Sequence, residues 1–516
     1  MEYSITTIGA ATLVFVVLMY CLSSSSRKAS EKRQPPQAGG ALPFIGHLHL
    51  LVGSKPAHVA LGDMADKYGP IFTFKLGVHR AIIVGNFEVA KECFTTNDKV
   101  FADRPIILAS EVMCYDLAMF GFSSYGPYWR HIRKIATVEL LSNHRLEMLK
   151  HVRESEVNAS IKEIYEISEN KNPIEMKRWL GDLNLNLICR MISGTSYAGG
   201  ARRTKDEKED KKRCEEAVRA FIELAGTFAM ADALPYLRRF DLGGTEKAMK
   251  RTAEDLDQIL QGWLDEHKMK KKMGISGEDF MDVMLSICDD EAAELHSYDS
   301  DTIIKATCLN LVLAGADTTT VALTWALCLL LNNLDVLKKA QEELDTHVGR
   351  GRQVQESDIE NLVYLQAILK ETLRIYPPTP LNALHISSKD CSVSGYHVPK
   401  GTRLFVNIGK IHRDSNVWAD PDEFRPERFL TTHKDFDVRG QHHELVPFGA
   451  GRRMCPGISF ALQVMLFTFA KLLHGFEIAS ADGEPIDMTG SPGLTNLKAT
   501  PLELMLSPRL PTHLYN

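Results

Sequence analysis

The residues best suited to chemistry gather around Cys455. Segment 448–457 reads FGAGRRMCPG, and its glycines let the backbone pass close to a flat, bulky group. Cys455 stands just before a helical run from Ile458, where free N–H groups and the positive helix end stabilise a thiolate. Arg452 and Arg453 add positive charge beside it. Because the thiolate is the form of cysteine that binds metals, the segment predicts a metal-ligating cysteine.

The rest of the sequence offers this metal few other ligands. The chain has 10 Cys and no C-x-x-C pair, and no His or Cys stands near Cys455 at zinc spacing. The metal must therefore bring most of its own coordination. A haem does so, because its ring nitrogens leave an axial position for one cysteine. The other cysteines are expected to be reduced thiols that pack as small apolar groups.

A second candidate site lies inside the long apolar segment 300–331. Residues 314–319 read AGADTT. Glycine inside a helix costs about 0.5–1 kcal/mol relative to alanine, and Asp317 beside Thr318 adds a desolvation cost. One interpretation is a polar turn that the helix merely tolerates. The other, which the cost favours, is a distorted turn that leaves room for a reactant beside the metal.

Two charged patterns also suggest a site. Glu371 and Arg374 are three residues apart and share a helix face, as do Trp129 and Arg133 at a spacing of four. Both patterns also fit an ordinary solvated helix surface, where isolated ion pairs contribute little.

The spacing F-x-x-G-x-R-x-C-x-G around Cys455 resembles the cytochrome P-450 superfamily of haem-thiolate monooxygenases. The other motifs stand at the order and distance of that superfamily, and the resemblance covers nearly the whole chain. It implies that Cys455 is the axial iron ligand of a haem b. It also implies that Asp317 and Thr318 are catalytic residues that support proton delivery during oxygen activation.

The resemblance assigns further roles. Glu371 and Arg374 would join Arg428, from segment 424–429, in a structural network that holds the haem-binding core. The resemblance also assigns five further residues to the cofactor, several of them at the haem propionates. These residues are Trp129, Arg133, His385, Phe448 and Arg453. His385 departs from the pattern, because close relatives more often carry Arg there.

Several details are similar to plant microsomal members. These are the proline-rich hinge, FADRP at 101–105, VRGQH at 438–442 and the part from 462 to 510. The last is especially similar to the plant family that contains nicotine N-demethylases and flavone 6- and 8-hydroxylases. Such enzymes imply a small hydrophobic substrate such as a flavonoid, coumarin, alkaloid or terpenoid. The implied substrate contacts are Ile107, Phe122, Leu313, Ala314, Leu381 and Leu494.

Hydrophobic periodicity predicts the elements that must position these residues. Helices are expected at 126–140, 146–169, 182–192, 214–228, 245–273 and 300–331. Short strands are expected at 71–76, 80–84, 392–398 and 403–406 and near the C-terminus. The fold class is therefore mainly α with a small β component, and the resemblance implies the cytochrome P-450 fold. The charged run 202–213 is expected to be a solvated loop, and 232–240 either a membrane contact or a buried turn.

The N-terminal region predicts a membrane anchor. Segment 3–22 has no charged residue and Arg27, Lys28, Lys32 and Arg33 follow it, which favours one bilayer crossing with the body in the cytosol. A cleaved signal peptide is the alternative, but no positive residue precedes the segment. The expected domains are an anchor at 1–24, a basic and proline-rich linker at 25–46 and a catalytic domain at 47–516. The expected location is the endoplasmic reticulum membrane, crossed once.

Composition excludes several classes of protein. The net charge is −6, hydrophobic residues make up 44% and charged residues 24%. These values exclude a disordered, collagen-like or polytopic membrane chain, and the lack of a basic excess argues against a nucleic-acid binder.

The expected activity is oxygen insertion from O2, with electrons from NADPH through a separate NADPH-cytochrome reductase, since the chain has no flavin or nicotinamide fingerprint. The reductase is expected to dock near Arg130, Arg133, Lys134 and Arg452. Two alternatives stay open. One is a haem-thiolate isomerase or dehydratase that does not use O2, and the other is a non-catalytic haem-binding protein. The Asp317–Thr318 pair argues against both.

Overall fold

The computed structural model describes residues 33–515 apart from 52–54, 196–204, 228, 242, 276 and 291–296. The anchor predicted at 1–24, and the linker as far as residue 32, lie outside the described residues.

The body is mainly helical. Its α-helices are α2 (Ala57–Tyr68), α3 (Phe87–Phe94), α4 (Leu108–Val112), α5 (Pro127–Glu139), α6 (Asn143–Met148), α7 (Lys150–Glu169), α8 (Met176–Ser193), α9 (Lys205–Gly226), α10 (Met230–Ala233), α11 (Thr245–Lys272), α12 (Phe280–Asp290), α13 (Ser300–Leu331), α14 (Leu334–His347), α15 (Val363–Ile375), α16 (Ile408–Ile411) and α17 (Ile458–Gly475). The mainly α class is thereby confirmed.

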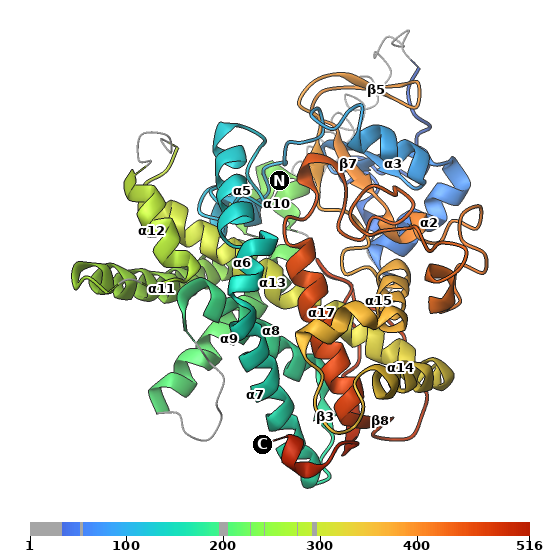
Figure 1. Cartoon of the computed structure of the whole chain (residues 1–516). Helices are drawn as coiled ribbons and strands as arrows, with labels where there is room; N and C mark the ends of the chain where they lie inside the picture. Colours follow the sequence, from blue (N-terminus) through green and yellow to red (C-terminus); the bar gives the residue numbers. More distant parts are fainter. Residues whose placement is uncertain are drawn as a thin grey trace, which may run out of the picture.

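The β component forms three small sheets. Their strands are β1 (Ile71–Leu76), β2 (His79–Val84), β3 (Ile174–Glu175), β4 (His385–Ile386), β5 (Cys391–Val393), β6 (Tyr396–Val398), β7 (Arg403–Val406), β8 (Phe476–Ser480) and β9 (Glu503–Pro508). The orders are β1-β2-β7-β4, β3-β9-β8 and β5-β6. In the first sheet β2 runs parallel to β7 and β4 antiparallel to it. The pairing places the edge strand β4, which contains His385, beside β7, and Figure 1 shows β7 next to α3.

Two apolar helices form the centre of the helical part. In Figure 1, α17 lies between α7 and α8 on one side and α14 and α15 on the other. Both α13 and α17 are long and apolar enough to span a membrane, but 78% of the apolar window of each is buried inside the body. This burial is typical of core helices that are apolar all round.

The helix predictions are largely confirmed, with two errors. The single helix expected at 146–169 is interrupted at Leu149, which ends α6 and precedes α7. The loop expected at 202–213 is also wrong, because α9 begins at Lys205. Charges four residues apart support that helix, since Lys211 lies 3.3 Å from Glu215 and Lys212 lies 3.7 Å from Glu216.

A buried charge network joins α15 to the segment that contains Arg428. Arg374 donates from Nε and Nη2 to the two Glu371 oxygens, both at 2.8 Å, and Arg428 Nε donates to Glu371 Oε1 at 2.9 Å. The remaining guanidinium hydrogens go to backbone carbonyls, including those of His412 and Ala419. All three charged side chains are at most 2% exposed. The geometry confirms that Arg428 joins the Glu371–Arg374 pair.

Replacing Glu371 tests the network. Glu371→Gln removes the carboxylate and leaves two buried guanidinium groups without a counter-charge, so we expect a loss of about 3–5 kcal/mol of folding free energy. The measurement is the midpoint of thermal unfolding of the holoprotein.

The matched control is Asp63→Asn, which breaks the exposed Lys55–Asp63 pair and should leave the midpoint almost unchanged. Equal midpoints for the two variants would contradict this account of the network.

Candidate functional site

The Cys455 loop is held by its own backbone. Cys455 N–H donates to Phe448 O at 3.0 Å, and Gly449 N–H donates to Val446 O at 2.9 Å. Gly451 has φ +67°, and a Cβ there would lie 2.5 Å from Asp98 Oδ1. Only glycine therefore fits this turn, and the loop presents Cys455 just before α17 begins.

His412 connects this loop to the buried charge network. Its Nδ1 donates to Arg374 O at 3.0 Å, and its Nε2 accepts from Val446 N–H at 2.9 Å. Burial lowers the pKa of His412 to about 3. The ring therefore stays neutral and keeps the tautomer that both hydrogen bonds require.

The electrostatic support of Cys455 differs from expectation. Burial raises the pKa of the thiol, and the Gly457 N–H and the charge of Arg133 only partly oppose that rise. Arg452 instead pairs with Asp98 at 2.9 Å, and Arg453 donates to backbone carbonyls. The protein therefore favours the neutral thiol more than the sequence predicts, and a metal cation at the sulfur would favour the thiolate. A haem iron would supply such a cation.

Among the described cysteines Cys455 is unusual in its surroundings. Cys455 and Cys391 are partly accessible, and the other seven are buried thiols. For Cys391, which lies far along the chain in β5, burial raises the pKa to about 11. The expectation that the other cysteines pack as small apolar groups is confirmed for the seven buried ones, whereas Cys391 is only partly buried.

Helix α13 has an accessible stretch in its middle. Ala314 is exposed and Gly315, Asp317 and Thr318 are half-buried, whereas α13 is buried from Ile303 to Leu313 and from Thr319 to Leu330. Phe460 and Val464 of α17 pack in the same apolar cluster as Leu313, Ala316 and Trp129. The accessible stretch of α13 therefore lies beside residues that share an apolar cluster with the start of α17.

The two predicted catalytic residues point to different partners. Asp317 Oδ2 accepts a hydrogen bond from Thr495 Oγ1 at 2.8 Å, and burial raises the pKa of the Asp317 carboxyl. Thr318 Oγ1 donates to Ala314 O at 2.8 Å, within its own helix. Asp317 can therefore hold a proton near neutral pH more readily than an exposed carboxyl, and Thr318 keeps oxygen lone pairs free to accept one.

Buried cations gather around Trp129 of α5. The guanidinium carbons of Arg453 and Arg133 lie 4.4 Å and 5.3 Å from the centre of its ring. Arg453 donates to Ala102 O at 2.7 Å and Phe120 O at 3.3 Å, and Arg133 donates to Met454 O. The structure thus brings together three of the predicted cofactor-binding residues.

Arg104 is a fourth member of this group that sequence reasoning missed. It donates to Gly121 O at 3.1 Å, Ala383 O at 2.9 Å and Leu384 O at 2.8 Å. Burial lowers the pKa of Arg104 to about 10, and burial together with the charge of Arg104 lowers that of Arg453 to about 9. The signal was the run FADRP, which had suggested only a family likeness.

These cations fit a ligand with carboxylates. In the part of the chain that the structure describes, no carboxylate lies within ion-pairing distance of Arg104, Arg133 or Arg453, and their hydrogen-bond acceptors are backbone carbonyls. Cations withdrawn from solvent without counter-charges are costly, and forked guanidinium donors match carboxylates well. The two propionates of a haem would supply the missing negative charge.

His385 does not present a free donor. Its Nδ1 donates to Phe101 O at 2.6 Å and its Nε2 accepts from Asn382 Nδ2 at 3.2 Å. Burial and the nearby charges of Arg104 and Arg453 lower the pKa of His385 well below its ordinary value. In this arrangement the ring has no N–H left for a propionate, so the expected contact would require Asn382 to release Nε2 and Nε2 to gain a proton.

The predicted substrate contacts are only partly brought together. Ile107 and Phe122 pack against the apolar cluster that contains Leu313, and Ala314 is exposed on the same helix. Leu381 packs in another cluster, with Phe405 of β7. Leu494 is 44% exposed, and its backbone N would lie 2.4 Å from a Cβ at Gly226. The close approach places the turn at Leu494 against the end of α9.

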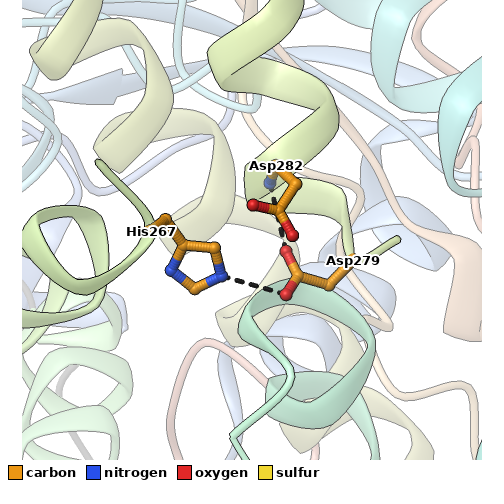
Figure 2. A group of neighbouring side chains, drawn as sticks. All are labelled: His267, Asp279 and Asp282. Carbon is orange, nitrogen blue, oxygen red and sulfur yellow. Dashed lines mark hydrogen bonds and ion pairs between the residues drawn. The ribbon is translucent and has the colours of Figure 1, made fainter. Parts of the chain in front are cut away.

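A second cluster of ligand-type side chains lies away from this site. Figure 2 shows His267 of α11 beside Asp279, with Asp282 of α12 next to them. His267 Nδ1 donates to Trp263 O at 2.6 Å, and Nε2 lies 2.9 Å from Asp279 Oδ2. The carboxylates raise the pKa of His267 above its ordinary value despite burial. A protonated His267 satisfies both contacts, so the cluster is an ion pair that ties α11 to α12.

Comparisons with known proteins agree with this geometry. The family described as Cytochrome P450 matches residues 35–505. The chain is 52% identical to strychnine-10-hydroxylase of Strychnos nux-vomica, over 100% of both chains. It is 50% identical to flavonoid-6-hydroxylase of Ocimum basilicum, over 99% of this chain and 97% of the relative. A zebra fish cytochrome P450 solved with progesterone has the same fold, with a TM-score of 0.75 and 24% identity over 88% of this chain and 100% of that one.

Replacing Arg104 tests its place in the site. Arg104→Ala removes a buried cation with a forked donor, so we expect haem to dissociate about 10- to 100-fold faster, as for loss of a charged hydrogen bond. Arg104→Lys keeps the charge without the fork and should give an intermediate rate. The measurement is haem transfer to an excess of apomyoglobin.

Arg130→Ala is the control, because Arg130 is an exposed cation of the same region that lies over Tyr125. If Arg104→Ala loses haem no faster than Arg130→Ala, Arg104 is not part of the site.

Proposed function

The chain belongs to the cytochrome P450 family and is an oxidoreductase of the monooxygenase class, and we propose that it inserts one oxygen atom of O2 into a small hydrophobic plant specialised metabolite. Electrons would come from NADPH through a separate reductase. The observation that carries the proposal is the pairing of a half-accessible Cys455 with a group of half-buried cations that lack carboxylate partners among the described residues.

The proposed cofactor is a haem b with Cys455 as its axial ligand. When bound, it supplies the iron centre at which dioxygen is reduced for transfer of one oxygen atom. The chain contributes the Gly457 N–H and the Arg133 charge at the sulfur. Arg104, Arg133 and Arg453 provide the donors for its carboxylates, and Trp129 packs beneath two of these guanidinium groups.

Asp317 and Thr318 are the proposed proton-handling residues. The raised pKa of Asp317 means that this carboxyl takes up a proton more readily than an exposed one, which suits a proton-handling role. The Thr495 hydroxyl donates to the same carboxyl and so fixes its orientation. Thr318 stands one position further along the accessible stretch of α13, where its hydroxyl can pass a proton on.

The substrate side of the site is mainly apolar. Ile107, Phe122, Leu313 and Ala314 offer carbon surface, which would orient a compact hydrophobic ligand mainly by shape. Two similar proteins are named for hydroxylation of strychnine and of a flavonoid. We therefore propose a flavonoid, coumarin, alkaloid or terpenoid as substrate, with hydroxylation as the favoured outcome.

A membrane-facing side supports the proposed location at the endoplasmic reticulum. Exposed apolar side chains occur at Leu42, Phe44, Val78, Tyr236 and Phe240. Backbone hydrogen bonds join their segments, since Gly77 N–H donates to Ile45 O at 3.2 Å and Val78 N–H donates to Ala233 O at 3.0 Å. Within 232–240, Ala233 and Leu234 are buried, as in a buried turn, and Tyr236 and Phe240 are exposed and would be able to contact a membrane.

The proposed reductase surface is smaller than the sequence predicts. Arg130 and Lys134 of α5 are exposed. Arg133 instead turns inward to Met454 O, and Arg452 is paired with Asp98. We propose Arg130 and Lys134 as the cations that attract an acidic reductase surface.

A reconstituted assay tests the function. We expect the full chain, with a plant reductase and NADPH, to convert at least one member of a panel of flavonoids, coumarins, alkaloids and terpenoids. Mass spectrometry under isotopically heavy oxygen gas should show one labelled atom in the product. Thr318→Ala should consume NADPH but release more hydrogen peroxide per NADPH, because proton delivery is impaired.

The alternatives give different results. Product formed without NADPH or without label would identify an isomerase or dehydratase. A haem-loaded protein that consumes no NADPH with any panel member would identify a non-catalytic haem binder.

A further inference from the structure

The segment between α4 and α5 contains a strained turn. Tyr115, Asp116 and Leu117 are consecutive residues with φ of 51°, 47° and 70°. This left-handed region is unfavourable for residues that carry a Cβ, and three in succession are rarer still. Such a conformation persists only where surrounding contacts over-determine it, and it often marks a functional position.

A carboxylate on α11 holds this turn. Tyr115 OH donates to Asp257 Oδ1 at 2.9 Å, and Lys305 Nζ of α13 donates to the same oxygen at 2.6 Å. Lys305 also donates to Gln261 Oε1 at 3.0 Å. The Asp257 side chain is 43% exposed and that of Lys305 only 11%. The three side chains therefore join the segment between α4 and α5 to α11 and α13, at a place where these elements meet solvent.

The inner end of the same loop reaches the site. Gly121 N–H donates to Asn310 Oδ1 of α13 at 2.8 Å, and Gly121 O accepts from Arg104. Phe120 O accepts from Arg453. Lys305 and Ala314 are nine residues apart, about 14 Å along the helix axis. A movement of the turn at Tyr115 would therefore reach Phe120 and Gly121, the loop residues that contact Arg453 and Arg104.

We propose that Asp257, with Tyr115 and Lys305, is a positioning residue that latches the 113–123 loop over the site and limits the rate at which a small hydrophobic ligand enters and leaves. Breaking the latch lets the left-handed turn relax and opens the seam between the loop, α11 and α13. The choice of ligand rests on the proposed monooxygenase function. The latch itself depends only on the contacts among Asp257, Tyr115 and Lys305.

Tyr115→Phe tests the latch with little change in volume, because it removes only the hydroxyl group. The probe is 4-phenylimidazole, whose binding to a haem is followed by stopped-flow absorbance. We expect association and dissociation to be about 10- to 100-fold faster than in the wild type, the size of effect that loss of a hydrogen bond to a charged group produces. The equilibrium dissociation constant should change much less than either rate. Asp257→Asn should act in the same direction.

Asp301→Asn is the matched control. It breaks the Lys268–Asp301 ion pair at 2.6 Å, which also joins α11 to α13 but does not contact the loop. It should leave both rates unchanged. Rates in Tyr115→Phe and Asp257→Asn that equal those of the control would overturn the proposal.

A second measurement does not depend on the haem. Hydrogen–deuterium exchange should become faster at the amides of 117–123 in Tyr115→Phe and stay at the wild-type rate in Asp301→Asn. Unchanged exchange in both variants would overturn the latch. A wild-type protein without any azole spectral change would contradict the proposed function, and the exchange comparison would still decide the latch.

Discussion

One carboxylate, that of Glu371, is the shared counter-charge of the two guanidinium groups of Arg374 and Arg428 in a buried part of the core. A series of single hydrogen bonds connects this network to the Cys455 loop. Arg374 O accepts from His412, His412 accepts from Val446 N–H, and the loop from Val446 to Phe448 accepts in turn from Gly449 and Cys455. The position of the sulfur is therefore set by a charge pair more than eighty residues away in sequence. A buried network of this kind is valuable only when every member is satisfied.

The site itself is organised around charges that the protein leaves unmatched. Burial raises the pKa of the Cys455 thiol and lowers the pKa values of the Arg104 and Arg453 guanidinium groups. A metal cation would favour the Cys455 thiolate, and carboxylates would favour the charged guanidinium groups. The proposed haem would supply both, and its binding would relieve two electrostatic costs at once.

Features that depend on local chemistry were predictable from the sequence. The helix at 300–331, the Cys455 loop and the Glu371–Arg374 spacing were predicted because their signals lie within a few residues of one another. Pairings between distant segments were not. Arg104 carries no sign that it would meet Gly121 and Leu384, and nothing in α11 indicates that Asp257 would hold Tyr115. The charged run that forms the start of α9 was misjudged because charge density suggests solvation, while the spacing of four that favours a helix was overlooked.

The central claim is that the sulfur of Cys455 is the axial ligand of a haem iron. The most direct measurement is the absorption spectrum of the reduced carbon monoxide complex of the wild type, Cys455→Ala and Cys391→Ala, the last being the other partly accessible cysteine that the structure describes. We predict the red-shifted band of thiolate ligation in the wild type and in Cys391→Ala, and its loss in Cys455→Ala. The thiolate band in Cys455→Ala, or an imidazole-type band in the wild type, would contradict the account.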